Sequence, residues 1–148
     1  MRVEAVPTAV RAAARLARQV EVALGDVDLS LPQYRVLAFL AEGSAAASAL
    51  AGRLAVSRPS VTALVDGLVG RGLVERASDP ADRRRVDHRL TSAGRRALVR
   101  ADAAVDARLQ SLAAHLDPAA AQAAMDALTF WGEAIDRARA AKQTAVSP

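Results

Sequence analysis

The chain has 148 residues, a net charge of +4 and no cysteine. Without cysteine, disulfides, thiolate catalysis and thiol redox sensing are excluded, and no run of roughly 18 apolar residues could cross a membrane. Arginines interrupt the first twenty residues, which therefore lack the apolar core of a signal peptide. We expect one soluble, cytoplasmic domain. It should be mostly helical, because alanine and leucine dominate long stretches that lack proline and glycine.

The positive charge is concentrated in the middle third of the chain. Residues 52–100 hold eleven basic and five acidic residues, a net charge of +6, whereas residues 1–51 are neutral overall. This distribution favours a polyanionic partner for the middle third.

The first two expected helices have clear stop signals. Apolar residues at helical spacing predict a helix over 8–25, which ends at Gly25. In "LSLPQYRVLAFLAEG", Ser30 and Gln33 have the spacing of a capping box, with a proline in the first turn, and Gly43 ends the helix.

Two shorter helices follow. The segment "SAAASALAGRLA" predicts a helix over about 46–55. In the next segment, Ser57 is an N-cap and Pro59 lies in the first turn. The apolar stripe of this helix buries one side and leaves a polar side exposed; the stripe consists of Val61, Leu64, Val65 and Leu68.

The periodicity changes to two between residues 73 and 91, which predicts a two-stranded hairpin with the turn "SDPADR". A long helix over about 92–115, capped by Thr91 or Ser92, and a last helix over about 121–139, after a restart at Asp117, complete the chain. The tail "KQTAVSP" is expected to fray.

Two short helices joined by a tight turn and followed by a basic hairpin describe a winged helix-turn-helix. The predicted fold class is therefore mainly α with a small β-hairpin wing, flanked by N- and C-terminal dimerisation helices. Short polar side chains at the start of a helix can reach base edges in the major groove, and arginines at a hairpin tip can contact backbone or minor groove. The candidate DNA-contacting residues are Ser57, Arg58, Ser60, Thr62, Ala63, Arg83, Arg84 and Arg85.

At this point the chain resembles the MarR family of transcriptional regulators. The pattern D-x-R-x5-L-T-x2-G is matched at every fixed position, by Asp82, Arg84, Leu90, Thr91 and Gly94. The segment "SRPSVTALVDGLVGRGLVER" is similar to the recognition helix of the family, and "ALAGRLAVS" to the helix before it.

The resemblance implies a single MarR-like domain over 1–148, with a DNA-binding region at about 30–92 and helical dimerisation regions at about 8–25 and 92–142. It further implies a homodimeric repressor that binds a palindromic double-stranded operator and is released by a small aromatic or phenolic effector. Three positions depart from the family pattern: Ala49 replaces a common acidic residue, and Ala63 and Gly67 replace longer side chains. We therefore expect Arg58, Ser60 and Thr62 to matter more.

Several residues have a structural alternative. The three wing arginines could form only a solvated turn, paired with acids, and Asp82 is expected to brace the turn. His88 is either a half-buried structural histidine, which we favour, or a pH- or metal-sensing group. Trp131 fits core packing better than ligand stacking.

Tyr34 and Phe39 are candidates for an effector pocket. No cofactor is expected, and no metal site, because the two histidines, His88 and His115, would need carboxylates as all further ligands. No nucleophile, base and orienting group can be combined into a catalytic site. The alternative function is an α-helical protein-interaction dimer that has lost specific DNA recognition.

Overall fold

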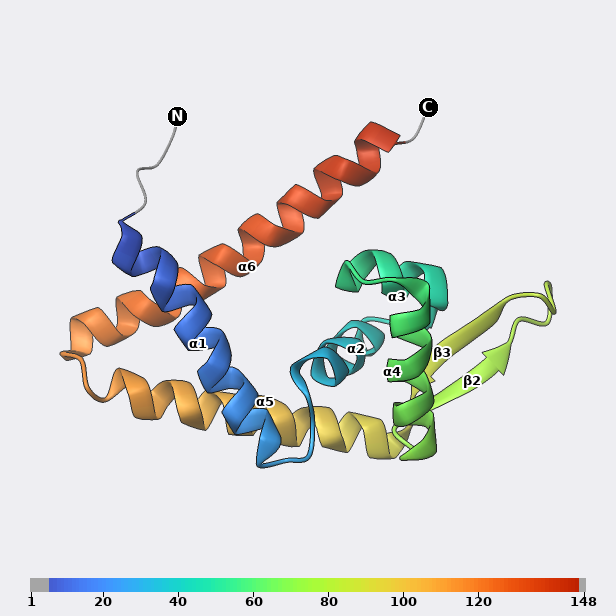
Figure 1. Ribbon diagram of the computed structural model, residues 1–148, viewed down its shortest axis with the longest axis horizontal. Coiled ribbons are helices and arrows are strands. Elements are labelled where there is room, and N and C mark those ends of the chain that lie inside the picture. The colour runs from blue at the N-terminus through green and yellow to red at the C-terminus, as the bar shows by residue number, and fades with distance from the viewer. Residues whose placement is uncertain (1–5, 147–148) are drawn as a thin grey trace. The chain divides into compact units, whose positions relative to one another are not determined.

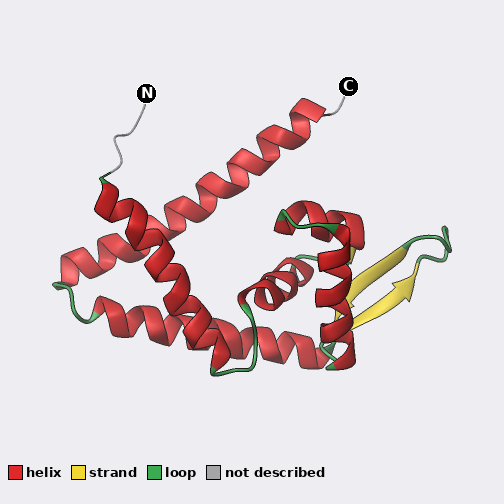
Figure 2. Cartoon of the chain, viewed as in Figure 1, coloured by secondary structure: helices red, strands yellow, loops and turns green. Residues whose placement is uncertain are grey.

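The computed structural model describes residues 6–146, in which the chain forms two compact units. The first unit ends at Arg108 and the second begins at Leu109, within a helix. The described residues form six helices and three strands (Figures 1 and 2). In chain order they are α1 (Pro7–Gly25), α2 (Leu31–Ala41), β1 (Ala45–Ala46), α3 (Ala47–Leu54), α4 (Arg58–Gly70), β2 (Val74–Ser78), β3 (Val86–Leu90), α5 (Ser92–Ala113) and α6 (Pro118–Val146).

The helix starts follow the local signals in the sequence. The capping box at α2 is confirmed: Ser30 Oγ accepts from the Gln33 N–H at 3.2 Å, and Gln33 Oε1 accepts from the Ser30 N–H at 3.0 Å. Thr91 Oγ1 accepts from the Gly94 N–H at the start of α5, and Asp117 Oδ1 accepts from the Ala120 N–H at the start of α6, both at 3.0 Å. Each bond satisfies a backbone donor that has no partner inside its helix.

The sheet is antiparallel and has three strands, in the order β1-β3-β2. The hairpin of β2 and β3 is confirmed, but the expectation of only two strands was wrong. Ala45 and Ala46 pair with His88 and Asp87, and the first short helix accordingly begins at Ala47. Two alanines carry no strand pattern of their own, so β1 forms only because the edge of β3 offers unpaired backbone groups.

The core of the first unit is formed by residues of α1 to α5 and of the strands. Its largest fully buried side chains come from five elements, so each of these elements contributes to one continuous core: Leu24, Val36, Leu37, Leu50, Val61, Val65, Leu68 and Val74. Leu64 is half-buried beside them, which confirms the apolar stripe of α4. Burying one side of α4 leaves its opposite side free for a partner.

The second unit consists of the end of α5 and the 29-residue α6. The expectation that "KQTAVSP" frays was wrong for the part that is described. The helix continues to Val146, because residues 142–146 include no glycine or proline that would stop it. Residues 147–148 lie outside the description. None of the described helices combines the length and the apolar character that crossing a membrane requires.

Candidate nucleic-acid interface

The exposed side of α4 carries the polar residues that the sequence singled out. Ser57, the N-cap of α4, and Arg58, its first residue, are exposed. Further along the same side, Ser60, Thr62 and Ala63 are exposed as well. All five α4 candidates are thus exposed, and α4 itself lies next to the hairpin (Figure 1).

The hydroxyl groups on this side are engaged within the helix itself. Ser57 Oγ accepts from the Ser60 N–H at 3.3 Å and lies 2.9 Å from Ser60 Oγ, and Thr62 Oγ1 donates to the Arg58 carbonyl at 3.0 Å. The guanidinium of Arg58, by contrast, forms no hydrogen bond or ion pair within residues 6–146. Arg58 is therefore the α4 side chain with the most donors free for a partner.

Two arginines that the sequence reasoning missed hold α4 in place. Arg76 on β2 forms an ion pair with Asp66 on α4. Arg71, which follows α4, donates from Nη1 to the carbonyl oxygen of Asp28 at 2.6 Å. The residues of the first pair lie ten positions apart, on a helix and a strand, so no periodic pattern indicated the contact.

Two aspartates organise the tip of the hairpin, which we call the wing tip (residues 79–85). Asp82 Oδ1 accepts from the Arg84 N–H at 3.0 Å, and Asp79 Oδ1 accepts from the Ala81 N–H at 2.9 Å. The Arg85 N–H donates to the Asp82 carbonyl at 3.0 Å, and its own carbonyl accepts from the Asp79 N–H at 3.1 Å. These bonds close the turn locally, as aspartate side chains commonly do.

The three arginines of the wing tip are exposed but differ in their partners. Arg85 Nε lies 3.0 Å from Asp87 Oδ1, and this hydrogen-bonded carboxylate raises the pKa of the Arg85 guanidinium further above its ordinary value. The side chains of Arg83 and Arg84 form no ion pair within the described residues. Two of the three positive charges thus have no ion-pair partner among residues 6–146.

The base of the wing is anchored by His88 and by the turn into α5. His88 is 5% exposed, and its Nδ1 lies 3.0 Å from the carbonyl oxygen of Ala45, so the buried histidine with a hydrogen-bond partner is confirmed. Thr91 Oγ1 also donates to the Gly72 carbonyl at 2.6 Å. A Cβ on Gly94 would lie 2.0 Å from the carbonyl oxygen of Leu73, which explains why glycine stands there.

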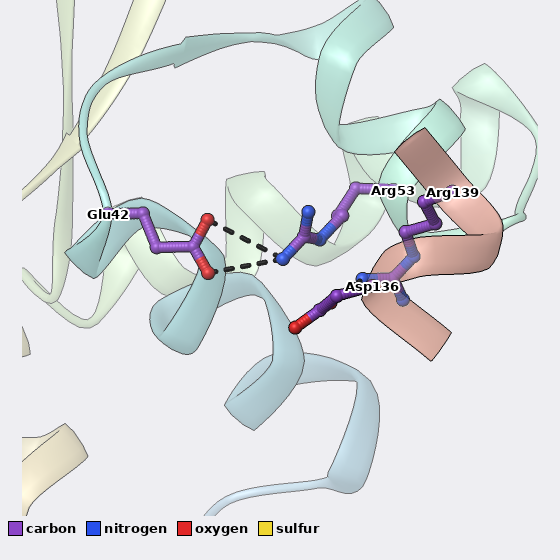
Figure 3. Close-up of polar contacts among 4 residues, drawn as sticks. All are labelled: Glu42, Arg53, Asp136 and Arg139. Carbon is purple, nitrogen blue, oxygen red and sulfur yellow. Dashed lines mark hydrogen bonds and ion pairs between the residues drawn. The ribbon is translucent and has the colours of Figure 1, made fainter. Parts of the chain in front are cut away.

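Tyr34 and Phe39, the candidates for an effector pocket, have partners inside the first unit. Tyr34 Oη donates to Asp102 Oδ1 at 2.7 Å. The Arg53 guanidinium carbon lies 5.1 Å from the centroid of the Phe39 ring, and Arg53 Nη2 lies 3.1 Å from Glu42 Oε1 (Figure 3). A pocket at these two residues stays a prediction.

A cavity of about 440 Å³ lies elsewhere, between the start of α3, the start of α4 and residues 84–88 of the wing. Neither Tyr34 nor Phe39 lines it, and its lining contains no acidic residue: Ala46, Ala47, Ser48, Ala49, Arg58, Arg84, Arg85, Val86 and His88. Across the part of the chain that the structure describes, no group of three or more histidine, aspartate or glutamate side chains is placed to hold a metal ion.

The helix pair α3 and α4, followed by the antiparallel wing, defines a winged helix-turn-helix fold. Residues 27–85 match the family model described as MarR family. No curated protein sequence matches the chain.

Three solved structures illustrate the likeness. Wild-type MarR from E. coli, in its apo form, has a TM-score of 0.74 and 22% identity, over 88% of this chain and 97% of that one. The transcriptional repressor CouR bound to a 23-mer DNA duplex has a TM-score of 0.70 and 29% identity, over 86% and 92%. CouR from Rhodococcus jostii RHA1 bound to p-coumaroyl-CoA has a TM-score of 0.64 and 29% identity, over 80% and 85%. The match over residues 27–85 and these structures show that the chain has the fold of the MarR-family regulators.

Proposed function

We propose that the protein is a homodimeric regulator that binds double-stranded DNA in a sequence-specific manner. The single observation that carries the proposal is the placement of Arg58, Arg83 and Arg84. Their exposed guanidinium groups lie on the first turn of α4 and on the neighbouring wing tip, without an ion pair in the described chain. Unpaired arginines on one surface are suited to phosphate oxygens and to the acceptor groups of guanine.

In this proposal α4 enters the major groove and the wing tip contacts the backbone or the adjacent minor groove. Arg58 reads base edges or a phosphate, assisted by Ser57, Ser60 and Thr62, while Ala63 allows close approach. The Arg83, Arg84 and Arg85 side chains contact the DNA backbone or minor groove, and Asp82 braces the turn. Base reading by α4 is sparse, because Ala63 and Gly67 offer no side-chain donors, so DNA shape contributes to specificity.

The second unit supports the dimer. None of the described residues of α6 is buried in the single chain, although a 29-residue helix needs packing to be stable. Trp131 is 69% exposed, and Leu128 and Ile135 are exposed on the same side of the helix. In this proposal a second copy covers this side of α6. Residues 8–25 and 92–142 are then the dimerisation regions, and residues 30–92 are the DNA-binding region of a single domain. Two-fold symmetry would then place the two α4 helices about one DNA turn, ~34 Å, apart on a palindromic operator.

The sign of regulation and the effector rest on relatives. CouR is named a transcriptional repressor in its DNA complex, and its other structure holds p-coumaroyl-CoA. By analogy, the protein represses genes near its own and is released by a small aromatic or phenolic compound, with Tyr34 and Phe39 as candidate pocket residues. This part of the proposal is supported by likeness alone.

Gel-shift measurements with DNA that flanks the gene of the protein test DNA binding. The wild type should bind one fragment selectively and lose affinity with salt, because arginine–phosphate contacts release counterions. Arg84→Ala should weaken binding and lower the slope of the salt dependence by about 1 for each phosphate that the arginine neutralises.

Arg100→Ala is the matched control, since it removes the same charge from an exposed position on α5. Selective binding that is equal in Arg84→Ala and Arg100→Ala would refute the role of the wing. A dimer that is indifferent to every duplex would rule out DNA recognition and favour a protein-interaction dimer instead.

A further inference from the structure

We propose that the cavity between α3, α4 and the wing is a binding site for a phosphate group. Its volume of about 440 Å³ lies in the range of small-molecule sites. Arginines line it from two separate elements: Arg58 from α4, and Arg84 and Arg85 from the wing. The cavity therefore collects positive charge without a carboxylate in its lining to balance it.

The guanidinium groups differ in availability. Arg85 is engaged by Asp87, whereas Arg58 and Arg84 have no side-chain partner within residues 6–146. Two unpaired guanidinium groups that border one cavity match the geometry of phosphate oxygens, each of which accepts several hydrogen bonds.

The start of α3 adds backbone donors to the same cavity. Ala46, the N-cap, has no side-chain oxygen, and no side chain caps α3. The next three residues, Ala47, Ser48 and Ala49, line the cavity. The first N–H groups of a helix have no partner inside it and carry partial positive charge, so they complement the arginines for an anion. Ala49, at the third helical position, carries no carboxylate that would oppose an anion at this helix start.

His88 forms the buried wall of the site. It is 5% exposed and borders the cavity, and Nδ1 is bonded to the Ala45 carbonyl. Its other ring nitrogen, Nε2, forms no hydrogen bond in the part of the chain that is described. Because Nδ1 donates its proton to the Ala45 carbonyl, Nε2 of the neutral ring is an acceptor, and beside the arginines it can accept a hydrogen bond from a protonated oxygen of a phosphate group.

The phosphate has two possible sources: the backbone of bound DNA, or a free phosphate compound. In both cases the recognising chemistry is the same. The binding of free phosphate does not depend on the proposed function, but its consequence does: a free phosphate that occupies the cavity of the operator complex would make repression phosphate-sensitive.

The test is a titration of the DNA-free protein with inorganic phosphate, against chloride at equal ionic strength, with the backbone amide of Ser48 followed by NMR. Wild type should show a saturable shift. Ala49→Glu places a carboxylate in the cavity and should weaken binding at least about tenfold, because a like charge opposes the phosphate. Ala49→Gln adds similar bulk without charge and should retain most of the binding.

Gly52→Glu is the control for net charge. Gly52 lies in the same helix, is exposed, does not line the cavity, and has no atom within 4 Å of an added Cβ. The Gly52→Glu variant should bind phosphate as tightly as the wild type does. No saturable shift at Ser48, or equal binding by Ala49→Glu and Gly52→Glu, would overturn the proposal. Unchanged amide spectra outside α3 verify the fold of each variant.

A second arm identifies the source of the phosphate. If the operator abolishes the response of Ser48 to phosphate, the cavity holds a DNA phosphate; if phosphate still binds to the operator complex, the ligand is the free compound. If the protein binds phosphate in the cavity but binds no operator DNA, the result supports the cavity site and contradicts DNA recognition. If the protein binds operator DNA but Ser48 shows no phosphate response, the result supports DNA recognition and contradicts the cavity site.

Discussion

The hydroxyl of Tyr34 joins α2 to α5 through its hydrogen bond to Asp102. Partial burial, this hydrogen bond and the charge of the carboxylate together raise the pKa of Tyr34 to about 12. The folded state therefore keeps the phenol proton at a pH at which an unfolded tyrosine, with a pKa near 10, has lost it. The contribution of Tyr34 to stability is complete below pH 10 and is lost as the pH rises toward 12.

Asp102→Asn should lower the pKa of Tyr34, since it removes the negative charge while burial remains. The chain contains a single tyrosine, so the ultraviolet absorbance of the phenolate reports this residue alone. Asp106→Asn, an exposed substitution one turn further along α5, is the control. An equal pKa for Tyr34 in both variants would contradict the assigned role of Asp102.

Gly94 is a second residue whose role depends on one contact. Gly94→Ala would place a Cβ 2.0 Å from the carbonyl oxygen of Leu73, and backbone has to move to relieve this overlap. We expect a loss of about 3 kcal/mol in the free energy of unfolding, as for severe overpacking, measured by urea denaturation. Gly52→Ala, where an added Cβ has no neighbour within 4 Å, should instead stabilise its helix by about 0.5–1 kcal/mol. Equal effects of the two substitutions would exclude the steric explanation.

At the scale of an element, the wing tip is ordered by its own aspartates. Asp82→Ala removes the acceptor for the Arg84 N–H, a bond that contributes about 1 kcal/mol to the turn. We expect higher mobility of the Arg83 and Arg84 amides in NMR relaxation and weaker operator binding. The global free energy of unfolding should fall by no more than about 1 kcal/mol, because the site is exposed.

Asp82→Asn is the matched variant. It removes the same charge but keeps a side-chain oxygen that can accept the Arg84 N–H. The wing should therefore stay ordered in Asp82→Asn, and operator binding should be maintained. If the wing amides of Asp82→Asn were as mobile as those of Asp82→Ala, the charge of Asp82 rather than its hydrogen bond would order the wing tip.

The elements themselves were largely predictable, because their signals are local. The capping box of Ser30 and Gln33, the apolar stripe of α4 and the alternation along β3 all depend on residues within a few positions of each other. The strand β1 was not predictable, since its alanines have no strand preference and pair only with β3. The Asp66–Arg76 pair was missed for the same reason: it joins two elements at a distance that no periodicity encodes.

At the scale of the whole molecule, the exposed apolar side of α6 predicts self-association. The chain has one tryptophan, Trp131, and it is 69% exposed in the single chain. In a dimer it should be shielded, so its fluorescence emission should shift to longer wavelength upon dilution as the subunits separate. Ile135→Asp places a charge on the same side and should give a monomer in sedimentation measurements.

Ala140→Asp adds the same charge at an exposed position on another side of α6 and should leave the dimer intact. A wild-type protein that sediments as a monomer would contradict the proposed assembly. If Ile135→Asp and Ala140→Asp had equal effects on dimerisation, the interface would not lie on the Trp131 side of α6.

The sequence by itself determined the order and type of the main helices, the wing, and the resemblance to the MarR family, because these follow from local spacing and from the ordered motif of Asp82, Arg84, Leu90, Thr91 and Gly94. It also indicated which α4 and wing residues are exposed together. Only the tertiary structure decided which arginines have partners among residues 6–146: Arg85 and Arg76 are paired, whereas Arg58 and Arg84 are not and border one cavity. Charge pairing and cavity formation depend on distances between elements that are remote in the chain, and a linear pattern does not contain those distances.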